Sequence, residues 1–279
     1  MQLTPTPTAA DPTARLRQNI AAHGSRLRVA LLHLAPVPGD LERNRRLVET
    51  AIETAAGMGV DWIVTPELCE CGYAFADRIG VEWIAPQPDP WMRDLSRLIA
   101  QQRVTVFLSR PERDPRAGKL HNTLFVIGAQ GEILGSHRKI NSLKIGPESW
   151  SSPGDRADPI VVEPWGRVGL LVCADAYTPR IATTLRERGA QWLVSSAAWH
   201  PGAYGPNGEW ERCTADTGLP LFVCNRTGMD DALDFTASES VAAHDGQRLL
   251  SFSSARPAVL RIEWDTAPQT LVGQQTCIL

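Results

Sequence analysis

The sequence predicts an α/β protein in which a mixed sheet, or a pair of sheets, is covered by helices. Two observations predict it: short apolar runs alternate with segments of helical apolar spacing, and no internal repeat interrupts this alternation. The chain has 279 residues, 43% of them hydrophobic, and is long enough to bury a substantial core. We therefore expect a flexible tail over residues 1–25, rich in Pro, Thr and Ala, and a single domain over residues 26–279.

The first elements form a strand, helix, strand unit. Residues 27–35 (LRVALLHLA) are an apolar run typical of a strand. Residues 39–59 predict a helix, with Asp40 as its N-cap and Gly57 near its end. Residues 60–67 (VDWIVTPE) predict the second strand. This order is typical of parallel strands joined by a crossover helix.

The alternation continues along the rest of the chain, broken by a loop rich in Pro, Gly and Ser over residues 146–159. The expected helices cover residues 89–102, 179–189 and 208–218. The expected strands cover residues 104–110, 167–173, 191–198 and 219–226, with a hairpin over 121–139 and antiparallel strands over 238–254 and 258–265.

The composition excludes several classes of function. A formal net charge of −3 offers no basic surplus for binding nucleic acid. The sequence has no run of 18 apolar residues, and its first residues lack the apolar core of a signal peptide, so we expect a cytoplasmic protein without membrane contact. The six cysteines are too sparse for a disulfide scaffold and are expected to be reduced. Cys69 and Cys71 are one residue apart, but no second Cys or His pair with zinc spacing follows them.

Three polar residues end apolar runs, and together they could form a nucleophilic site. They are Glu67, Lys139 and Cys173. A thiol needs a base within hydrogen-bond reach, which Glu67 could supply. Attack on an amide carbonyl places negative charge on its oxygen, which Lys139 and the backbone N–H of Ala174 could stabilise. Glu67 could then protonate the leaving amine and activate the water that hydrolyses the thioester.

Each of these residues also has a common structural use. A free cysteine is usually a buried thiol, and a glutamate or lysine at a strand end is usually solvated. Asp175 fits a turn or cap that shapes the loop after Cys173 better than a second acid. No histidine is placed for a Cys–His pair, which argues against a papain-type hydrolase. The residues alone leave the function open.

Three separated segments resemble the nitrilase superfamily, the carbon-nitrogen hydrolases. They are VTPELCECGYAF at residues 64–75, SHRKINSLKIGPESWSSPGD at 136–155 and VGLLVCADAYTP at 168–179. The order Glu, Lys, Cys, with spacings of 72 and 34 residues, suits that family. Many members carry Pro-Glu after the nucleophile turn, whereas Pro179 is followed here by Arg180, which leaves the substrate preference open.

The resemblance implies a four-layer α-β-β-α sandwich whose members commonly pair through their helical layers, so we expect a homodimer or higher homo-oligomer. It implies Glu67 as general base and acid, Lys139 as oxyanion partner and Cys173 as nucleophile. Glu148 is implied as a second carboxylate that orients Lys139 or the substrate. Lys144 is a rival for the ammonium role. No metal or organic cofactor is implied.

The expected pocket combines aromatic walls with a charged group. Tyr73, Tyr177 and Trp199 are expected to contact substrate, with Glu239 as the charged group. Trp210 and Arg226 are further candidates, but a tryptophan of this kind could equally lie in the core or at a subunit contact.

The resemblance implies hydrolysis of a small linear amide or N-carbamoyl compound, with release of ammonia or an amine. True nitrilases typically carry Trp-Glu directly after the cysteine, whereas Ala174 and Asp175 stand here. A nitrile substrate, and a non-catalytic member that serves as a ligand-binding module, are the alternatives, because a fold does not determine a function.

Overall fold

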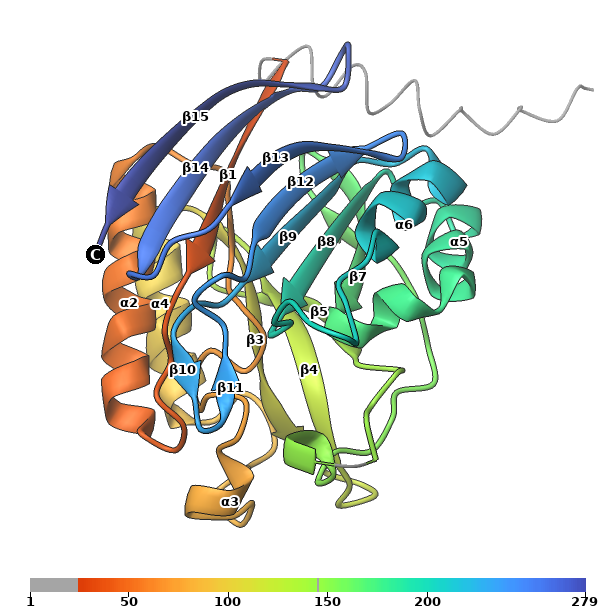
Figure 1. Cartoon of the computed structure of the whole chain (residues 1–279). Coiled ribbons are helices and arrows are strands. Elements are labelled where there is room, and N and C mark those ends of the chain that lie inside the picture. Colours follow the sequence, from red (N-terminus) through yellow and green to blue (C-terminus); the bar gives the residue numbers. More distant parts are fainter. Residues whose placement is uncertain (1–24, 145) are drawn as a thin grey trace, which may run out of the picture.

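The computed structural model describes residues 25–144 and 146–279 (Figure 1). The tail expected over residues 1–25 lies, apart from Ser25, outside these described residues. Within them, no helix is both long enough and apolar enough to cross a bilayer.

Two sheets form the centre of the fold. The seven-stranded sheet has the order β15-β14-β1-β2-β3-β4-β5 and the six-stranded sheet the order β13-β12-β9-β8-β7-β6. The first contains β1 (Arg26–His33), β2 (Trp62–Val64), β3 (Thr105–Arg113), β4 (Leu120–Ile127), β5 (Ile133–Arg138), β14 (Ala258–Asp265) and β15 (Thr270–Ile278). The second contains β6 (Ile160–Val162), β7 (Gly166–Val172), β8 (Trp192–Ala197), β9 (Leu221–Asn225), β12 (Ser240–His244) and β13 (Gln247–Phe252). A separate hairpin joins β10 (Met229–Asp230) to β11 (Leu233–Asp234).

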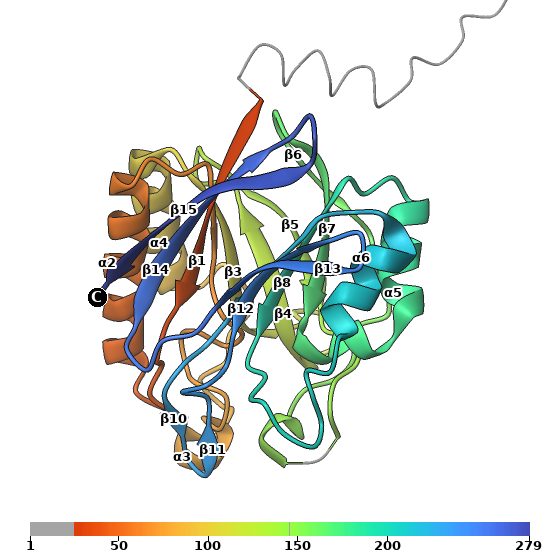
Figure 2. The ribbon, with the colours of Figure 1, turned by 45° about the horizontal axis from the view of Figure 1, so that its top comes forward.

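Helices cover both outer faces of this pair of sheets (Figures 1 and 2). The helices α2 (Leu41–Gly57) and α4 (Pro90–Gln102) lie on the seven-stranded side, and α5 (Pro179–Glu187) and α6 (Glu209–Thr217) lie on the six-stranded side. The short helix α3 (Ala76–Ile79) and the 3₁₀ turns η1 (Gly146–Glu148) and η2 (Cys173–Tyr177) lie in connecting segments. The predicted α/β class, with sheets covered by helices, is confirmed.

Large aromatic side chains fill the space between the sheets. Trp62 on β2 is fully buried, and its ring lies 5.2 Å from that of Phe107 and 5.9 Å from that of Trp192 on β8. Phe222 on β9 and Trp264 on β14 make a second edge contact across the sheets, at 5.5 Å. Burial of side chains of this size is the main favourable term that holds the two sheets together.

The local sequence explains most element boundaries. Asp40 caps α2 as predicted, because its carboxylate accepts a hydrogen bond from the backbone N–H of Arg43 at 3.1 Å. The pairs β1–β2, β2–β3, β7–β8 and β8–β9 are parallel, which confirms the expected crossover units. The second strand is shorter than expected: it ends at Val64, so Glu67 lies in the turn after it. The edge strand β15 was not predicted, because it is mostly exposed and lacks a clear alternation of apolar residues.

Candidate active site

The carboxylate of Glu67 is held between the two sheets. Glu67 follows β2 and is fully buried. Its Oε2 accepts a hydrogen bond from the backbone N–H of Ala198 at 2.9 Å, and its own N–H donates to the carbonyl of Ala197 at 3.2 Å. Since Ala197 ends β8, the turn after β2 in one sheet is tied to the carboxyl end of a strand in the other.

Lys139 and Asn122 join Glu67 to a second carboxylate. Lys139 directly follows β5, is fully buried, and its Nζ donates to Glu67 Oε1 at 2.7 Å and to Glu148 Oε2 at 2.7 Å. The Nδ2 of Asn122, on β4, donates to Glu67 Oε1 at 2.7 Å and to Glu148 Oε1 at 3.0 Å. The four side chains therefore form a closed ring of hydrogen bonds, in which two donors are shared between two carboxylates.

The ring carries two carboxylates and one ammonium, and all three groups are fully buried. Burial lowers the pKa of Lys139, but the negative charges of Glu67 and Glu148 raise it by more, so the net shift is well upward. Burial raises the pKa of Glu148, Lys139 lowers it and Glu67 raises it, and the net shift is upward. Lys139 therefore stays charged, and Glu148 is easier to protonate than an exposed glutamate.

Cys173 lies beside this ring at the end of β7. It begins the 3₁₀ turn η2 and has a φ of +46°. Its thiol donates to the carbonyl of Ala198 at 3.9 Å, so thiol and carboxylate of Glu67 are both in contact with Ala198. Burial raises the pKa of the Cys173 thiol well above its ordinary value, Glu67 raises it further, and Lys139 opposes both. The resting thiol is therefore protonated and must lose its proton as it attacks.

Aromatic side chains lie near the ring of hydrogen bonds and near the turn that carries Cys173. The hydroxyl of Tyr73 donates to Glu148 Oε2 at 3.3 Å. The ring of Tyr177, in the same turn as Cys173, lies 4.8 Å from that of Trp199. The carbonyl of Tyr204 accepts hydrogen bonds from the Tyr177 hydroxyl and from Trp199 Nε1. These three expected substrate contacts therefore lie near the ring of hydrogen bonds or near η2 (Cys173–Tyr177), the nucleophile turn.

Other candidates have partners of their own. The carboxylate of Glu239 forms an ion pair with Arg248 on β13, so its contact with substrate stays a prediction. Arg226 is fully buried and paired with Asp230, and Trp210 is fully buried with its ring 5.4 Å from that of Trp199, so contact of either residue with substrate stays a prediction. These assignments follow from contacts between segments, which the sequence pattern did not show.

Lys144 and the cysteine pair are set apart from this chemistry. The Nζ of Lys144 is bound to the carbonyl of Ser151 at 3.0 Å, whereas Lys139 contacts both carboxylates. Cys69 and Cys71 are buried. Across residues 25–144 and 146–279, no group of three or more His, Cys, Asp or Glu side chains is placed to hold a metal ion.

Sequence reasoning missed Asn122. The residue lies within the expected hairpin over residues 121–139, where an amide next to the apolar run of Leu, Phe, Val and Ile was the available signal. The structure shows that Asn122 is fully buried. Its partners are 55 and 26 residues away along the chain, so local pattern could not name them.

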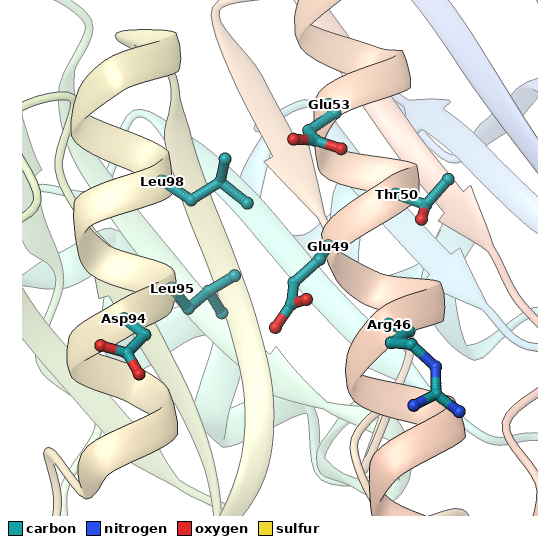
Figure 3. Close-up of a pocket in the computed structure, with 7 residues that line it drawn as sticks. All are labelled: Arg46, Glu49, Thr50, Glu53, Asp94, Leu95 and Leu98. Atoms are coloured by element: carbon teal, nitrogen blue, oxygen red, sulfur yellow. The ribbon is translucent and has the colours of Figure 1, made fainter.

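A groove of about 400 Å³ lies elsewhere, between α2 and α4 (Figure 3). Its lining includes Leu95 and Leu98 together with the acidic side chains Glu49, Glu53 and Asp94. The groove holds no thiol and lies on the outer helical layer, so it does not share the chemistry around Cys173.

The arrangement around Cys173 is suited to acyl transfer. It combines a thiol, a carboxylate that can take its proton, and an ammonium that can stabilise negative charge on a carbonyl oxygen. Because all of these groups are buried, their electrostatic interactions are stronger than they would be in water.

Known proteins share this sequence pattern and fold. Residues 28–258 match the family model described as carbon-nitrogen hydrolase. The chain is 23% identical to a probable nitrilase of Schizosaccharomyces pombe, in a match that covers 83% of this chain and 86% of that protein. It is 25% identical to a formamidase of Bacillus cereus, over 78% of this chain and 63% of the formamidase.

Solved structures show the same fold. An amidase from Nesterenkonia sp. superposes with a TM-score of 0.75 at 24% identity, over 87% of this chain and 92% of the amidase. A nitrilase-superfamily member of Saccharomyces cerevisiae gives a TM-score of 0.76 at 21% identity, over 87% of this chain and 91% of that one. Mutants of the Nesterenkonia amidase have been solved in complex with acrylamide and with butyramide.

Proposed function

Because the chain belongs to the carbon-nitrogen hydrolase family, we propose that it hydrolyses the carbon–nitrogen bond of a small linear amide or N-carbamoyl compound. The observation that carries the proposal is the position of Cys173 beside the buried ring of Glu67, Lys139 and Glu148. The relatives described as amidase and formamidase support this reaction class.

The first half of the reaction forms a thioester. The Cys173 sulfur attacks the amide carbonyl carbon while its proton passes to Glu67, and the oxygen of the tetrahedral intermediate becomes negative. Lys139 and the backbone N–H of Ala174 stabilise this oxyanion. When the carbon–nitrogen bond breaks, Glu67 gives the proton to the leaving nitrogen, and ammonia or an amine departs.

The second half uses water. Glu67, again a carboxylate, takes a proton from a water molecule as the water oxygen attacks the thioester carbonyl. The carbon–sulfur bond then breaks, the proton returns to sulfur, and the acid product leaves. Glu148 holds Lys139 in place through both halves, because its Oε2 accepts a hydrogen bond from Nζ at 2.7 Å.

A short, uncharged amide is the substrate that we propose first. Tyr73 and Trp199 are large buried side chains near the thiol, and they favour a small acyl group. The complexes of the Nesterenkonia amidase with acrylamide and butyramide support the same size class. The S. pombe relative described as a probable nitrilase keeps a nitrile as the second candidate, since thiol attack begins both reactions.

Ammonia release tests the proposal. We expect the protein to release ammonia from at least one member of a panel of short aliphatic amides, ω-amides and carbamoyl compounds, and Cys173→Ala to lose this activity. Cys224→Ala is the matched control, because Cys224 is another buried thiol that donates to a backbone carbonyl, here that of Leu32. Undiminished turnover in Cys173→Ala would remove Cys173 from the reaction. No turnover on amides or nitriles would favour the ligand-binding alternative.

The assembly and location of the protein are also proposals. The helical layers of α2 with α4 and of α5 with α6 are available for pairing of two copies, and light scattering of the purified protein measures the oligomeric state. We propose a homodimer or higher homo-oligomer that works in the cytoplasm without nucleic acid or membrane contact.

A further inference from the structure

The nucleophile lies in a backbone conformation that needs support. The φ of Cys173 is +46°, in the left-handed region that residues other than glycine rarely adopt. Such a conformation persists only when the surrounding structure holds it. One support comes from Asp175, whose Oδ2 accepts a hydrogen bond from the backbone N–H of Val172 at 2.9 Å. Asp175 therefore binds the residue directly before the nucleophile.

The same carboxylate also holds residues 137–141, the lysine segment, which carries Lys139. Oδ1 of Asp175 accepts hydrogen bonds from the backbone N–H groups of Ile140 at 3.0 Å and Asn141 at 2.9 Å. Oδ2 also contacts His137 Nε2 at 2.8 Å. One carboxylate thus contacts the chain on both sides of Lys139.

Asn141 makes the connection in the opposite direction. Its side-chain Nδ2 donates to the carbonyl of Ala174 at 2.8 Å and to Thr178 Oγ1 at 2.8 Å. Ala174 directly follows Cys173, and its N–H is the backbone donor assigned to the oxyanion. The lysine segment and the nucleophile turn are therefore bound to each other from both sides.

The contact between Asp175 and His137 is buried, with side-chain exposures of 0% and 1%. Burial raises the pKa of Asp175, but the contact with His137 and the hydrogen bonds from the backbone N–H groups of Asn141 and Val172 together lower it by more, so the net shift is downward. Cys213, on α6, is a further titratable group near this carboxylate. His137 thus helps to keep Asp175 a carboxylate, the form that can accept from four donors at once.

We infer that Asp175, His137 and Asn141 are positioning residues, which bind the nucleophile turn to the lysine segment as one unit and so set the placement of Cys173 relative to Lys139. The inference rests on the proposed function, because it concerns the geometry of that reaction. None of the three side chains needs to touch the substrate.

The test uses Asp175→Asn and a matched control, Asp61→Asn. Asp61, like Asp175, accepts hydrogen bonds from backbone and side chain together, here both of Arg28, but it precedes β2 at the end away from Glu67. Asp175→Asn should lower kcat about 100-fold and leave KM within about threefold, because a misplacement of about 1 Å has this effect on rate. Asp61→Asn should leave both constants unchanged.

A histidine pair supplies the rescue. His137→Phe should lower kcat in the same way, and His137→Gln, which retains a side-chain donor, should recover most of it. A merely structural role predicts equal loss in both variants, in proportion to their loss of thermal stability. That result, or wild-type kcat in Asp175→Asn, would overturn the inference.

The proposed function and this inference can fail separately. If Cys173→Ala retains full turnover, the assignment of Cys173 as nucleophile in the proposed function has failed. If no amide is hydrolysed at all, covalent addition of acrylamide to Cys173, followed by mass spectrometry, replaces kcat as the readout, because it needs the same thiol placement. We expect addition to be slower in Asp175→Asn than in Asp61→Asn; equal rates would overturn the positioning role.

Discussion

Replacement of Lys139 by methionine should reveal how strongly the active-site charges depend on one another. Lys139→Met removes an ammonium that lies 2.7 Å from an oxygen of Glu67 and 2.7 Å from an oxygen of Glu148. All three side chains are fully buried, so the variant leaves two carboxylates without a cation between them. Loss of one partner from a buried ion pair costs about 3–5 kcal/mol of unfolding free energy. We expect a loss of that size at pH 8.

The pH dependence has a definite sign. In the variant, burial and the charge of Glu67 raise the pKa of Glu148, without the opposing effect of Lys139, above the unfolded value of about 4.3. The folded state then binds more protons than the unfolded state, so the unfolding free energy falls as pH rises through the folded-state pKa. The cost of Lys139→Met should therefore be smaller at pH 5 than at pH 8. In the wild type, the upward shift in the pKa of Glu148 already points in this direction.

Urea unfolding followed by tryptophan fluorescence measures the effect, since the chain has nine tryptophans. Lys144→Met is the control: Lys144 is exposed and bound only to the carbonyl of Ser151, so its loss should change stability by less than about 0.5 kcal/mol. Lys139→Met should also lose about 100- to 1,000-fold in kcat, as expected when an oxyanion donor is removed. A Lys139→Met protein as stable as the wild type at pH 8, with the same pH profile, would refute the reasoning.

Three further predictions concern buried polar groups. Burial lowers the pKa of His33 to about 4, so between pH 6.5 and 4 the unfolded chain binds a proton more readily than the folded protein does. The unfolding free energy therefore falls on acidification, by about 2 kcal/mol from pH 7 to 5. His33→Gln should flatten this pH dependence, as measured by urea unfolding. Asn122→Leu removes the donor shared by two carboxylates, and should lower kcat in steady-state assays and stability by about 1–3 kcal/mol. Arg110→Met removes a fully buried guanidinium bound to Glu70 and Asp89, and should cost about 3–5 kcal/mol in urea unfolding while kcat of the folded protein is retained.

Each of these has a contrary result. An unchanged pH slope in His33→Gln would show that this imidazole does not govern acid stability. Wild-type kcat in Asn122→Leu would mean that Lys139, with the other donors to the two carboxylates, holds them in place without Asn122. A fall in kcat in Arg110→Met, measured on folded protein, would show that the ion pairs around Glu70 also control the position of Glu67, three residues earlier.

Much of the fold could be predicted because apolar periodicity is a local property. The helix around Val48 and the strand around Leu31 are recognised from neighbours within a few residues. The predicted end of β2 was wrong, because Thr65 and Pro66 are buried like the strand residues before them although the chain has already left the sheet. The exposed edge strand β15 carried no such pattern and was missed.

The candidate site was predicted in part, for the same reason. Glu67, Lys139 and Cys173 each stand at the end of an apolar run, and the structure brings them together where the two sheets meet. Glu239 was predicted as a substrate contact, but the sequence did not show its ion pair with Arg248 on β13. Arg248 would compete with a substrate for the Glu239 carboxylate.

The sequence by itself determined the order and type of most elements and which chemical groups stand at their ends. Only the tertiary structure decided how those groups are paired: Asn122 between two carboxylates, and Asp175 with His137 between the lysine segment and the nucleophile turn. The physical reason is that a hydrogen bond depends on tenths of an ångström and on direction, and these are set by the packing of two sheets whose strands are far apart in the chain. A periodic pattern carries information about the type and order of elements, but not about which side chains pair across the two sheets.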